Sequence, residues 1–387
     1  MNETLALSAV GLATLALALP AAKRRLELSI AKHPSLTGHA RMAKRVAALL
    51  PGYAYDADQF FNADRAPAEA VSRRRMALQR LSQLFAERHA RTLAVTRQTA
   101  EGLSDLQFTS AYRVPFQFSP YLRQHLQIPS FVREAAGVTF TDLDGNVFYD
   151  LTGSYGVNLL GHDFYKRCMA EGASRAQALG MVLGGLHPAV ADNVARLRAI
   201  SGLDEVSFHM SGTEAVMQAV RLARYHTRRT HLVRFCGAYH GWWEDVQPGP
   251  GNPVKPRDTY TLKEMDADTL RVLRTRNDIA CVLVNPLQGL HPNSAAPGDS
   301  SLVDSSRRAA FDRAAYTAWL QQLREVCTTR GIVLIFDEVF MGFRLAMGGA
   351  QAYFGVQADM VTYGKTLGGG LPVGVVCGKQ ALMKRYR

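Results

Sequence analysis

The stretch that decides the fold reads Ile332-Val333-Leu334-Ile335-Phe336-Asp337-Glu338-Val339. It is an unbroken apolar run, rich in β-branched residues and too short for a typical helix, and it ends in carboxylates. Such a run predicts a strand that is buried on both faces of a parallel sheet. Ligands of these sheets bind beyond the carboxyl ends of the strands, which is where we expect Asp337 to lie.

A second apolar strand is expected at Met360-Val361-Thr362-Tyr363, and it is followed by Gly364 and Lys365. An acid and a lysine at the ends of two such strands are what a pyridoxal-phosphate site requires. The lysine forms a Schiff base with the cofactor, and the acid keeps the ring nitrogen protonated so that the ring accepts electrons. An ordinary ion pair at the rim of a sheet is the alternative. A nucleotide P-loop is excluded, because Asp359 stands where that motif needs its first glycine.

The composition describes a globular protein with a large core. Of the 387 residues, 47% are hydrophobic and 20% are charged, and the length allows two domains or one large domain with an appendage. The net charge is +12, and residues 1–130 hold 17 of the 45 basic side chains but only 9 of the 33 acidic ones. Neither zinc-ligand spacing nor a nucleic-acid motif accompanies this charge. We therefore expect a solvated basic face, no nucleic-acid partner and no metal.

The five cysteines are dispersed and form no C-x-x-C pair, which favours reduced core residues in a cytoplasmic protein. They are Cys168, Cys236, Cys281, Cys327 and Cys377.

The segment Thr4–Ala22 carries no charge, consists mostly of Leu and Ala, and is followed by Lys23-Arg24-Arg25. It does not resemble a secretory signal, because Met1-Asn2-Glu3 is not basic. Its length is marginal for a membrane span, which needs about 20 apolar residues. Two alternatives stay open. The segment is an anchor that leaves the rest of the chain on the cytoplasmic face of a membrane, or it is a helix packed on the protein or at a dimer interface.

From residue 26 to about residue 104 the pattern is helical and carries no recognisable chemistry. Ala43–Leu50 and Arg73–Thr99 place apolar residues at helical spacing. A hairpin is expected at Gly137–Asp150, with Asp144-Gly145 at its turn. From residue 165 onward, helix-like and strand-like segments alternate, which predicts an α/β domain.

Two segments of that domain carry candidate ligand contacts. Glu205–Met210 is expected to be a strand that turns through Ser211-Gly212-Thr213 into a helix whose free amides suit a phosphate, with plain N-capping as the alternative. Leu232–Phe235 is expected to be a strand followed by Tyr239, which either stacks on a flat cofactor ring or is a buried structural tyrosine. The remaining expected elements are a strand at Ala280–Val284 and a helix at Phe311–Thr329.

Taken in order, these segments resemble those of the class III, fold type I, pyridoxal-phosphate aminotransferases, and within that family most the glutamate-1-semialdehyde aminomutases. The resemblance covers about residues 108–387, and its motifs fall in the family's order. These motifs are Asp142-Leu143-Asp144-Gly145-Asn146, Ser154-Tyr155-Gly156, Ser211-Gly212-Thr213-Glu214-Ala215, Tyr239-His240-Gly241, Asp337-Glu338-Val339, Gly342-Phe343-Arg344, and Gly364-Lys365 through Pro372-Val373-Gly374.

The resemblance implies an α/β fold, with a mostly parallel, seven-stranded-type sheet between helices and a helical N-terminal extension. It divides the chain into an apolar segment at 1–25, the helical extension at 26–104, an N-terminal segment of the aminotransferase fold at 105–160, and the large cofactor-binding domain at 161–387. It also implies transfer of an amino group from a small-molecule donor to an aldehyde or keto acceptor, in a homodimer when the protein is full length. A glutamate-1-semialdehyde-type aminomutase or a racemase is the alternative on the same fold. A catalytically inactive fragment with a scaffolding role is the alternative of another class.

The resemblance also implies roles for three residues around the ring of the cofactor, pyridoxal 5'-phosphate. Lys365 would be the Schiff-base lysine and would carry the proton between Cα of the substrate and C4′ of the cofactor. Asp337 would pair with the pyridinium nitrogen, and Val339 would lie against the ring.

The phosphate, the other side of the ring and the substrate have implied partners as well. Gly212 and Thr213, helped by Ser211, would hold the phosphate, and Tyr239 would stack on the ring. Arg113 lies in a segment similar to the family's S-P-V-R, and its guanidinium would meet the substrate carboxylate.

The chain departs from the family pattern in three places. It has Asn285-Pro286 where the family usually has Glu-Pro, and the helical segment before residue 105 has no counterpart in the simple aminomutase. It also ends 22 residues after Lys365 (387 − 365), before the phosphate-binding loop and the small domain with which the family continues. We therefore expect the chain to stop in the middle of the family's fold, and a fragment and a true short protein are both open alternatives.

Overall fold

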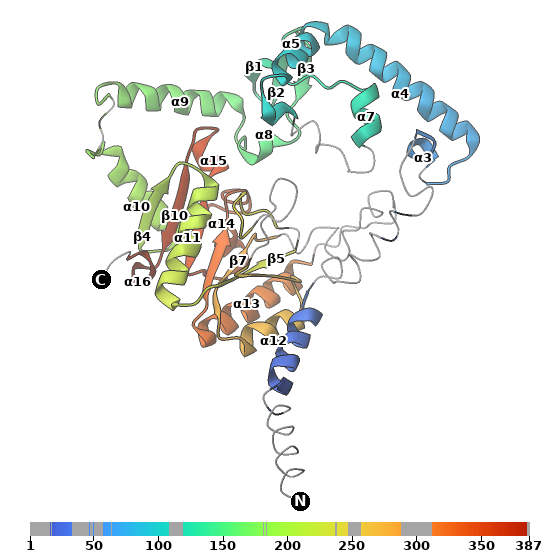
Figure 1. The fold of residues 1–387 in the computed structure, drawn as a ribbon. Coiled ribbons are helices and arrows are strands. Elements are labelled where there is room, and N and C mark those ends of the chain that lie inside the picture. The colour runs from blue at the N-terminus through green and yellow to red at the C-terminus, as the bar shows by residue number, and fades with distance from the viewer. Residues whose placement is uncertain are drawn as a thin grey trace, which may run out of the picture. The chain divides into compact units, whose positions relative to one another are not determined.

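The computed structural model describes residues 16, 18–32, 46, 49, 57–62, 64–107, 119–180, 182, 184–236, 238–246, 257–287 and 312–384 (Figure 1). The chain forms two compact units. The first consists of residues 1–37, 183–294 and 309–387, and the second of residues 38–182 and 295–308.

A seven-stranded sheet forms the centre of the first unit, in the order β4-β10-β9-β8-β7-β5-β6. The strands β6, β5, β7, β8 and β9 run parallel to one another, whereas β10 runs antiparallel to both β9 and β4. The mostly parallel α/β sheet predicted from the sequence is therefore confirmed. The strands are β4 (Glu205–His209), β5 (His231–Phe235), β6 (Thr259–Leu262), β7 (Ile279–Val284), β8 (Val333–Asp337), β9 (Met360–Tyr363) and β10 (Gly374–Gly378).

Helices cover both faces of this sheet (Figure 1). In β8, Leu334 and Phe336 pack into the core cluster that includes α12 and α13, whereas Val333 and Ile335 pack into the cluster formed with α11. This alternation confirms that the opening stretch is a strand buried on both faces, because each face of a parallel sheet is covered by crossover helices. The helices are α10 (Ala189–Ser201), α11 (Gly212–Thr227), α12 (Ala267–Thr275), α13 (Arg313–Arg330), α14 (Gly349–Phe354), α15 (Lys365–Gly368) and α16 (Gln380–Met383).

A three-stranded antiparallel sheet, β1-β2-β3, forms part of the second unit together with helices. The predicted hairpin is confirmed, with Thr139 opposite Tyr149 and Phe140 opposite Phe148. The elements are α3 (Ala57–Asn62), α4 (Ala68–Arg88), α5 (Ala90–Ala100), α7 (Ser119–His125), β1 (Val132–Ala136), β2 (Thr139–Asp142), β3 (Val147–Tyr149), α8 (Gly153–Gly156) and α9 (His162–Gln177).

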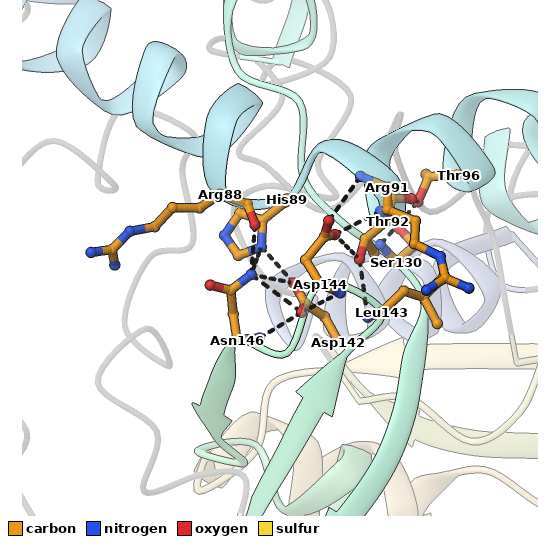
Figure 2. Close-up of polar contacts among 10 residues, drawn as sticks. All are labelled: Arg88, His89, Arg91, Thr92, Thr96, Ser130, Asp142, Leu143, Asp144 and Asn146. Atoms are coloured by element: carbon orange, nitrogen blue, oxygen red, sulfur yellow. Dashed lines mark hydrogen bonds and ion pairs between the residues drawn. The ribbon is translucent and has the colours of Figure 1, made fainter.

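The hairpin turn holds the junction of α4 and α5 through a polar network (Figure 2). Asp144 Oδ1 accepts a hydrogen bond from Arg91 N (2.9 Å), and Asp144 Oδ2 accepts from Thr92 N (2.8 Å) and from Thr92 Oγ1 (2.6 Å). His89, the residue between the two helices, places Nδ1 2.6 Å from Asp142 Oδ2. The side chain of His89, the N-cap residue of α5, makes no capping hydrogen bond. Asp144 therefore caps the N-terminus of α5 in its place.

Most of the apolar segment Thr4–Ala22 and of the predicted helix Ala43–Leu50 lies outside the described residues. Of the helices that the structure does describe, none has the length and hydropathy needed to cross a bilayer. Residues 18–30 are helical, and Ala31 O accepts a hydrogen bond from Lys263 N (3.0 Å), which ties this helix to the loop that follows β6.

The five cysteines all lie in the described part of the chain and form no disulfide there, but the expectation that they are core residues holds only in part. Cys281, Cys327 and Cys377 are buried and Cys236 is intermediate, whereas Cys168 is exposed on α9. The exposure follows from the position of Cys168 on a helix with no fully buried residue.

Candidate active site

Asp337 is the last residue of β8, and its side chain is buried, with 4% of its surface exposed. Its Oδ1 accepts hydrogen bonds from Val339 N and from Thr362 Oγ1, each at 3.1 Å. Its Oδ2 lies 2.7 Å from Nδ1 of His240. A buried carboxylate is costly unless donors meet it, and here three donors hold its orientation.

His240 lies in the loop after β5 and is 1% exposed. Since Asp337 can only accept from it, Nδ1 carries the hydrogen of this contact. On the other side of the ring, Nε2 is buried and has no hydrogen-bond partner within the described part of the chain. His240 is not among the site residues predicted from the sequence, although its place in Tyr239-His240-Gly241 is a signal for it.

Lys365 is the first residue of α15 and directly follows Gly364 at the end of β9. Burial lowers the pKa of its ammonium group, and nearby Arg344 acts in the same direction, while Asp337 opposes both. Its Nζ lies 5.9 Å from the centre of the Phe340 ring. Among the described residues, no ion pair joins Lys365 to Asp337, whose basic partner is His240 instead. The simple rim ion pair considered from the sequence is therefore wrong.

The start of α11 lies beside these groups. Ser211 is the N-cap residue, and its Oγ accepts a hydrogen bond from Glu214 N (3.2 Å), which confirms the predicted capping. Glu214 Oε2 in return accepts from Met210 N (2.8 Å). This reciprocal arrangement fixes the first turn of a 16-residue helix, whose positive end favours an anion.

Glycines let three backbone segments approach one another here. A Cβ atom on Gly212 would lie 2.6 Å from Val339 Cγ1, and one on Gly241 would lie 2.7 Å from Thr213 Oγ1. Gly241 also has a φ of +97°, which side-chain-bearing residues rarely adopt. Larger residues at either position would displace the wall of the site.

These elements enclose a cavity of about 230 Å³. It brings together all of the predicted cofactor-contacting residues, although they come from four separate parts of the sequence, and it also includes Asn285, which follows β7. The lining residues are Ser211, Gly212, Thr213, Val216, Tyr239, His240, Gly241, Asn285, Asp337, Val339, Phe340 and Lys365.

The two alternatives for Tyr239 and the predicted substrate contact of Arg113 have different outcomes. Tyr239 is 56% exposed, so it is not a buried structural tyrosine. Partial burial raises the pKa of its hydroxyl, and the charge of Asp337 adds to the rise. Arg113 lies outside the described residues.

The sequence of residues 121–244 and 308–387 matches the aminotransferase class-III family. The chain belongs to this family. The matched segments include Ser211, Tyr239, Asp337 and Lys365, the four positions from which the candidate site is built.

Several relatives of this class III chain are curated as glutamate-1-semialdehyde 2,1-aminomutases. The chain is 35% identical over 275 residues to the protein of Alkaliphilus oremlandii and 37% identical over 277 residues to that of Citrifermentans bemidjiense. Each alignment covers 66% of this chain and 59% of the relative, so the chain spans about three fifths of the length of these relatives.

Solved structures agree with the class III fold. An omega-transaminase from Sphaerobacter thermophilus is 29% identical, with a TM-score of 0.55 over 67% of this chain and 59% of its own. A glutamate-1-semialdehyde aminomutase from Pseudomonas aeruginosa gives a TM-score of 0.65 over 82% of this chain and 68% of its own. Its 21% identity supports the fold type I architecture and nothing further.

Proposed function

We propose that the chain carries the cofactor site of a pyridoxal-phosphate-dependent enzyme that transfers amino groups, with Lys365 as the residue that bonds to the cofactor. The observation that supports this most strongly is the meeting of three groups in one cavity. These are a half-buried lysine at the end of β9, a buried carboxylate at the end of the neighbouring β8, and the N-terminus of α11.

The residues present fit such a cofactor. The missing side chains at Gly212 and Gly241 leave backbone close to the start of α11, which suits a phosphate group. We propose that Ser211, Gly212 and Thr213 hold that phosphate, and that the exposed ring of Tyr239 stacks on the cofactor ring.

The other wall of the cavity suits the ring. The carboxylate of Asp337 is held in place by three donors and suits a protonated ring nitrogen. Val339 is the apolar side chain that would lie against the ring. It fits beside Gly212 and Gly364 because a Cβ atom on either glycine would lie too close to its Cγ1.

The chain's own residues supply binding and proton transfer. When bound, the cofactor supplies a carbonyl for amines and a ring that accepts electrons. Lys365 has a lowered pKa because it is partly desolvated, so a larger fraction of it is the neutral amine that acts as nucleophile and base near neutral pH. His240 orients Asp337 and shields it from water, since both side chains are buried.

A second candidate is an aminomutase that moves the amino group within one molecule, and it is favoured by the names of the curated relatives. A racemase differs again only in where the proton returns. Product analysis separates these possibilities, because a transaminase needs a separate keto or aldehyde acceptor whereas an aminomutase does not. An inactive scaffold would give no product in either assay.

Other features of the whole protein remain proposals. We propose a cytoplasmic homodimer, Arg113 as a substrate-binding residue, and the four-part division at residues 25, 104 and 160. We also propose that Thr4–Ala22 serves membrane association or packing and not catalysis, because it lies far from every motif in the sequence. Deletion of this segment should leave covalent cofactor binding intact. Loss of that binding in a folded deletion protein would contradict the proposal.

A further inference from the structure

We infer that Glu338 is a positioning residue. Its buried side chain fixes the loop Val339–Gly348 against the cavity and thereby sets the surroundings of the Lys365 ammonium group.

Glu338 ties together the two ends of this loop. Its backbone N donates to Thr362 O (2.9 Å), and its backbone O accepts from Gly342 N (2.7 Å), so the residue is anchored to β9 and to the first turn of the loop. Its two carboxylate oxygens lie 3.0 and 2.9 Å from Ala350 N, in the first turn of α14. The side chain is 1% exposed. Glu338 therefore closes the loop by linking its beginning to the helix at its end.

The neighbouring backbone is built around this carboxyl group. Gly349 has a φ of +66°, and a Cβ atom there would collide with Glu338 Oε2. No basic side chain forms an ion pair with Glu338 among the described residues, and the titratable groups near it are Asp337 and Tyr363. Burial raises the pKa of Glu338 to about 7, and the charge of Asp337 adds to the rise. The hydrogen bonds from the Ala350 and Gln351 amides act in the opposite direction and lower the pKa. The site thus suits a carboxyl group that keeps its proton at moderately acidic pH.

The loop connects Glu338 with Lys365 through one aromatic ring. Phe340 lines the cavity, and the centre of its ring lies 5.9 Å from Lys365 Nζ and 4.9 Å from Arg344 Cζ. Arg344 is held in place because its Nε donates to Phe340 O (2.8 Å). Burial and Arg344 both lower the pKa of Lys365. Release of the loop should expose Lys365 to water, separate it from Arg344, and raise its pKa.

A catalytic role for the neutral amine of Lys365 rests on the proposed function. The effect of Glu338 on the surroundings of Lys365 does not. The test therefore uses the full chain without added cofactor. Lysines are labelled in trace amounts with an acylating reagent over a series of pH values, and each site is quantified by mass spectrometry. The pH midpoint of each site's labelling profile reports its pKa and does not depend on how easily the reagent reaches that site. Exposed Lys166 on α9 is the internal reference. The matched control is Glu325→Ala, which removes an exposed glutamate from α13.

Glu338→Ala should raise the pH midpoint of Lys365 labelling by about half a pH unit relative to Lys166, because the pKa of the exposed ammonium group is higher. Glu338→Asp, whose carboxylate is too short to reach Ala350 N, should give the same shift and decides the matter if the alanine variant does not fold. Glu338→Gln should stay near wild type, because its amide oxygen can still accept from Ala350 N.

Two results would overturn the inference. One is an unchanged pH midpoint of Lys365 labelling in folded Glu338→Ala or Glu338→Asp, and the other is an equal shift in Glu325→Ala. Failure of the proposed function would appear differently, as a lack of covalent cofactor on Lys365, and would leave these midpoints unchanged.

Discussion

His240 Nδ1 lies 2.7 Å from Asp337 Oδ2, and the two residues are 1% and 4% exposed. The pair joins the loop after β5 to the end of β8, across 97 residues of sequence. Because both side chains are buried, the contact fixes both the tautomer of the histidine and the direction in which the carboxylate faces the cavity.

Replacing His240 by Asn should therefore lower turnover while leaving the fold intact. The shorter amide is a poorer match for Asp337 Oδ2, so the carboxylate is held mainly by Val339 N and Thr362 Oγ1. Loss of a buried hydrogen-bond partner costs about 1–3 kcal/mol. A loss of this much transition-state stabilisation lowers kcat by about 5- to 160-fold. Steady-state kinetics of His240→Asn, with exposed His125→Asn as the control, measures this. Unchanged kcat would show that Asp337 does not depend on His240.

Lys365→Ala should abolish covalent cofactor binding and the visible absorbance band that accompanies it. Non-covalent binding should persist more weakly, because Ser211, Gly212, Thr213 and Asp337 remain. Borohydride reduction of the folded full-length protein with added cofactor, followed by peptide mapping, identifies the bonded lysine. Lys166→Ala is the control and should label as wild type does. A label on another lysine, or none, would show that the site is misassigned.

Asp337→Asn should keep the fold and most of the cofactor affinity but lower turnover by orders of magnitude. The amide can still accept from Val339 N and Thr362 Oγ1, and His240 can adopt the other tautomer to accept from the new NH₂ group. The charge that keeps a ring nitrogen protonated is lost, so proton removal from the substrate should slow most. Single-turnover kinetics with a deuterated substrate would reveal this step. A rate near that of wild type would reduce Asp337 to a structural carboxylate.

The stability of the protein should depend on pH through Glu338. Its pKa is raised from 4.5 to about 7 in the folded chain, so the folded state binds the proton more tightly than the unfolded state. The resulting stabilisation is fully present below the unfolded pKa and is lost as pH rises through about 7. The free energy of unfolding should fall by on the order of 3 kcal/mol across this range.

Denaturant unfolding of wild type and of Glu338→Gln between pH 4 and pH 8 tests this dependence. The glutamine cannot ionise, so the variant should gain relative to wild type with rising pH and level off above neutrality. Other buried acids, such as Glu264, cancel in the difference because both proteins contain them. A difference that is constant across this range would contradict the assignment.

Much of the fold could be predicted because its signals are local. The apolar runs of β7, β8 and β9 and the cap at Ser211 depend on neighbouring residues, and they appear where expected. The contacts of His240 and Glu338 are not local. His240 meets a residue 97 positions away, and Glu338 depends on the left-handed backbone of Gly349, so neither contact follows from local spacing, although the motif around His240 marks that residue as a candidate.

The hairpin turn combines a local signal with contacts that are distant in sequence. Asp144-Gly145 predicts the turn, but not the hydrogen bonds by which Asp144 caps a helix about 50 residues earlier (Figure 2). Asp144→Ala should leave Arg91 N and Thr92 N without their acceptor and cost about 0.5–2 kcal/mol, the usual range for a lost cap. Hydrogen exchange of the α5 amides should accelerate several-fold, whereas Glu87→Ala, on the exposed side of α4, should not change it. Asp144→Asn should lie between the two, because one oxygen can still accept. If exchange in α5 were unaffected in Asp144→Ala, the helix would be held by packing alone, and the turn would have no part in attaching the helical extension.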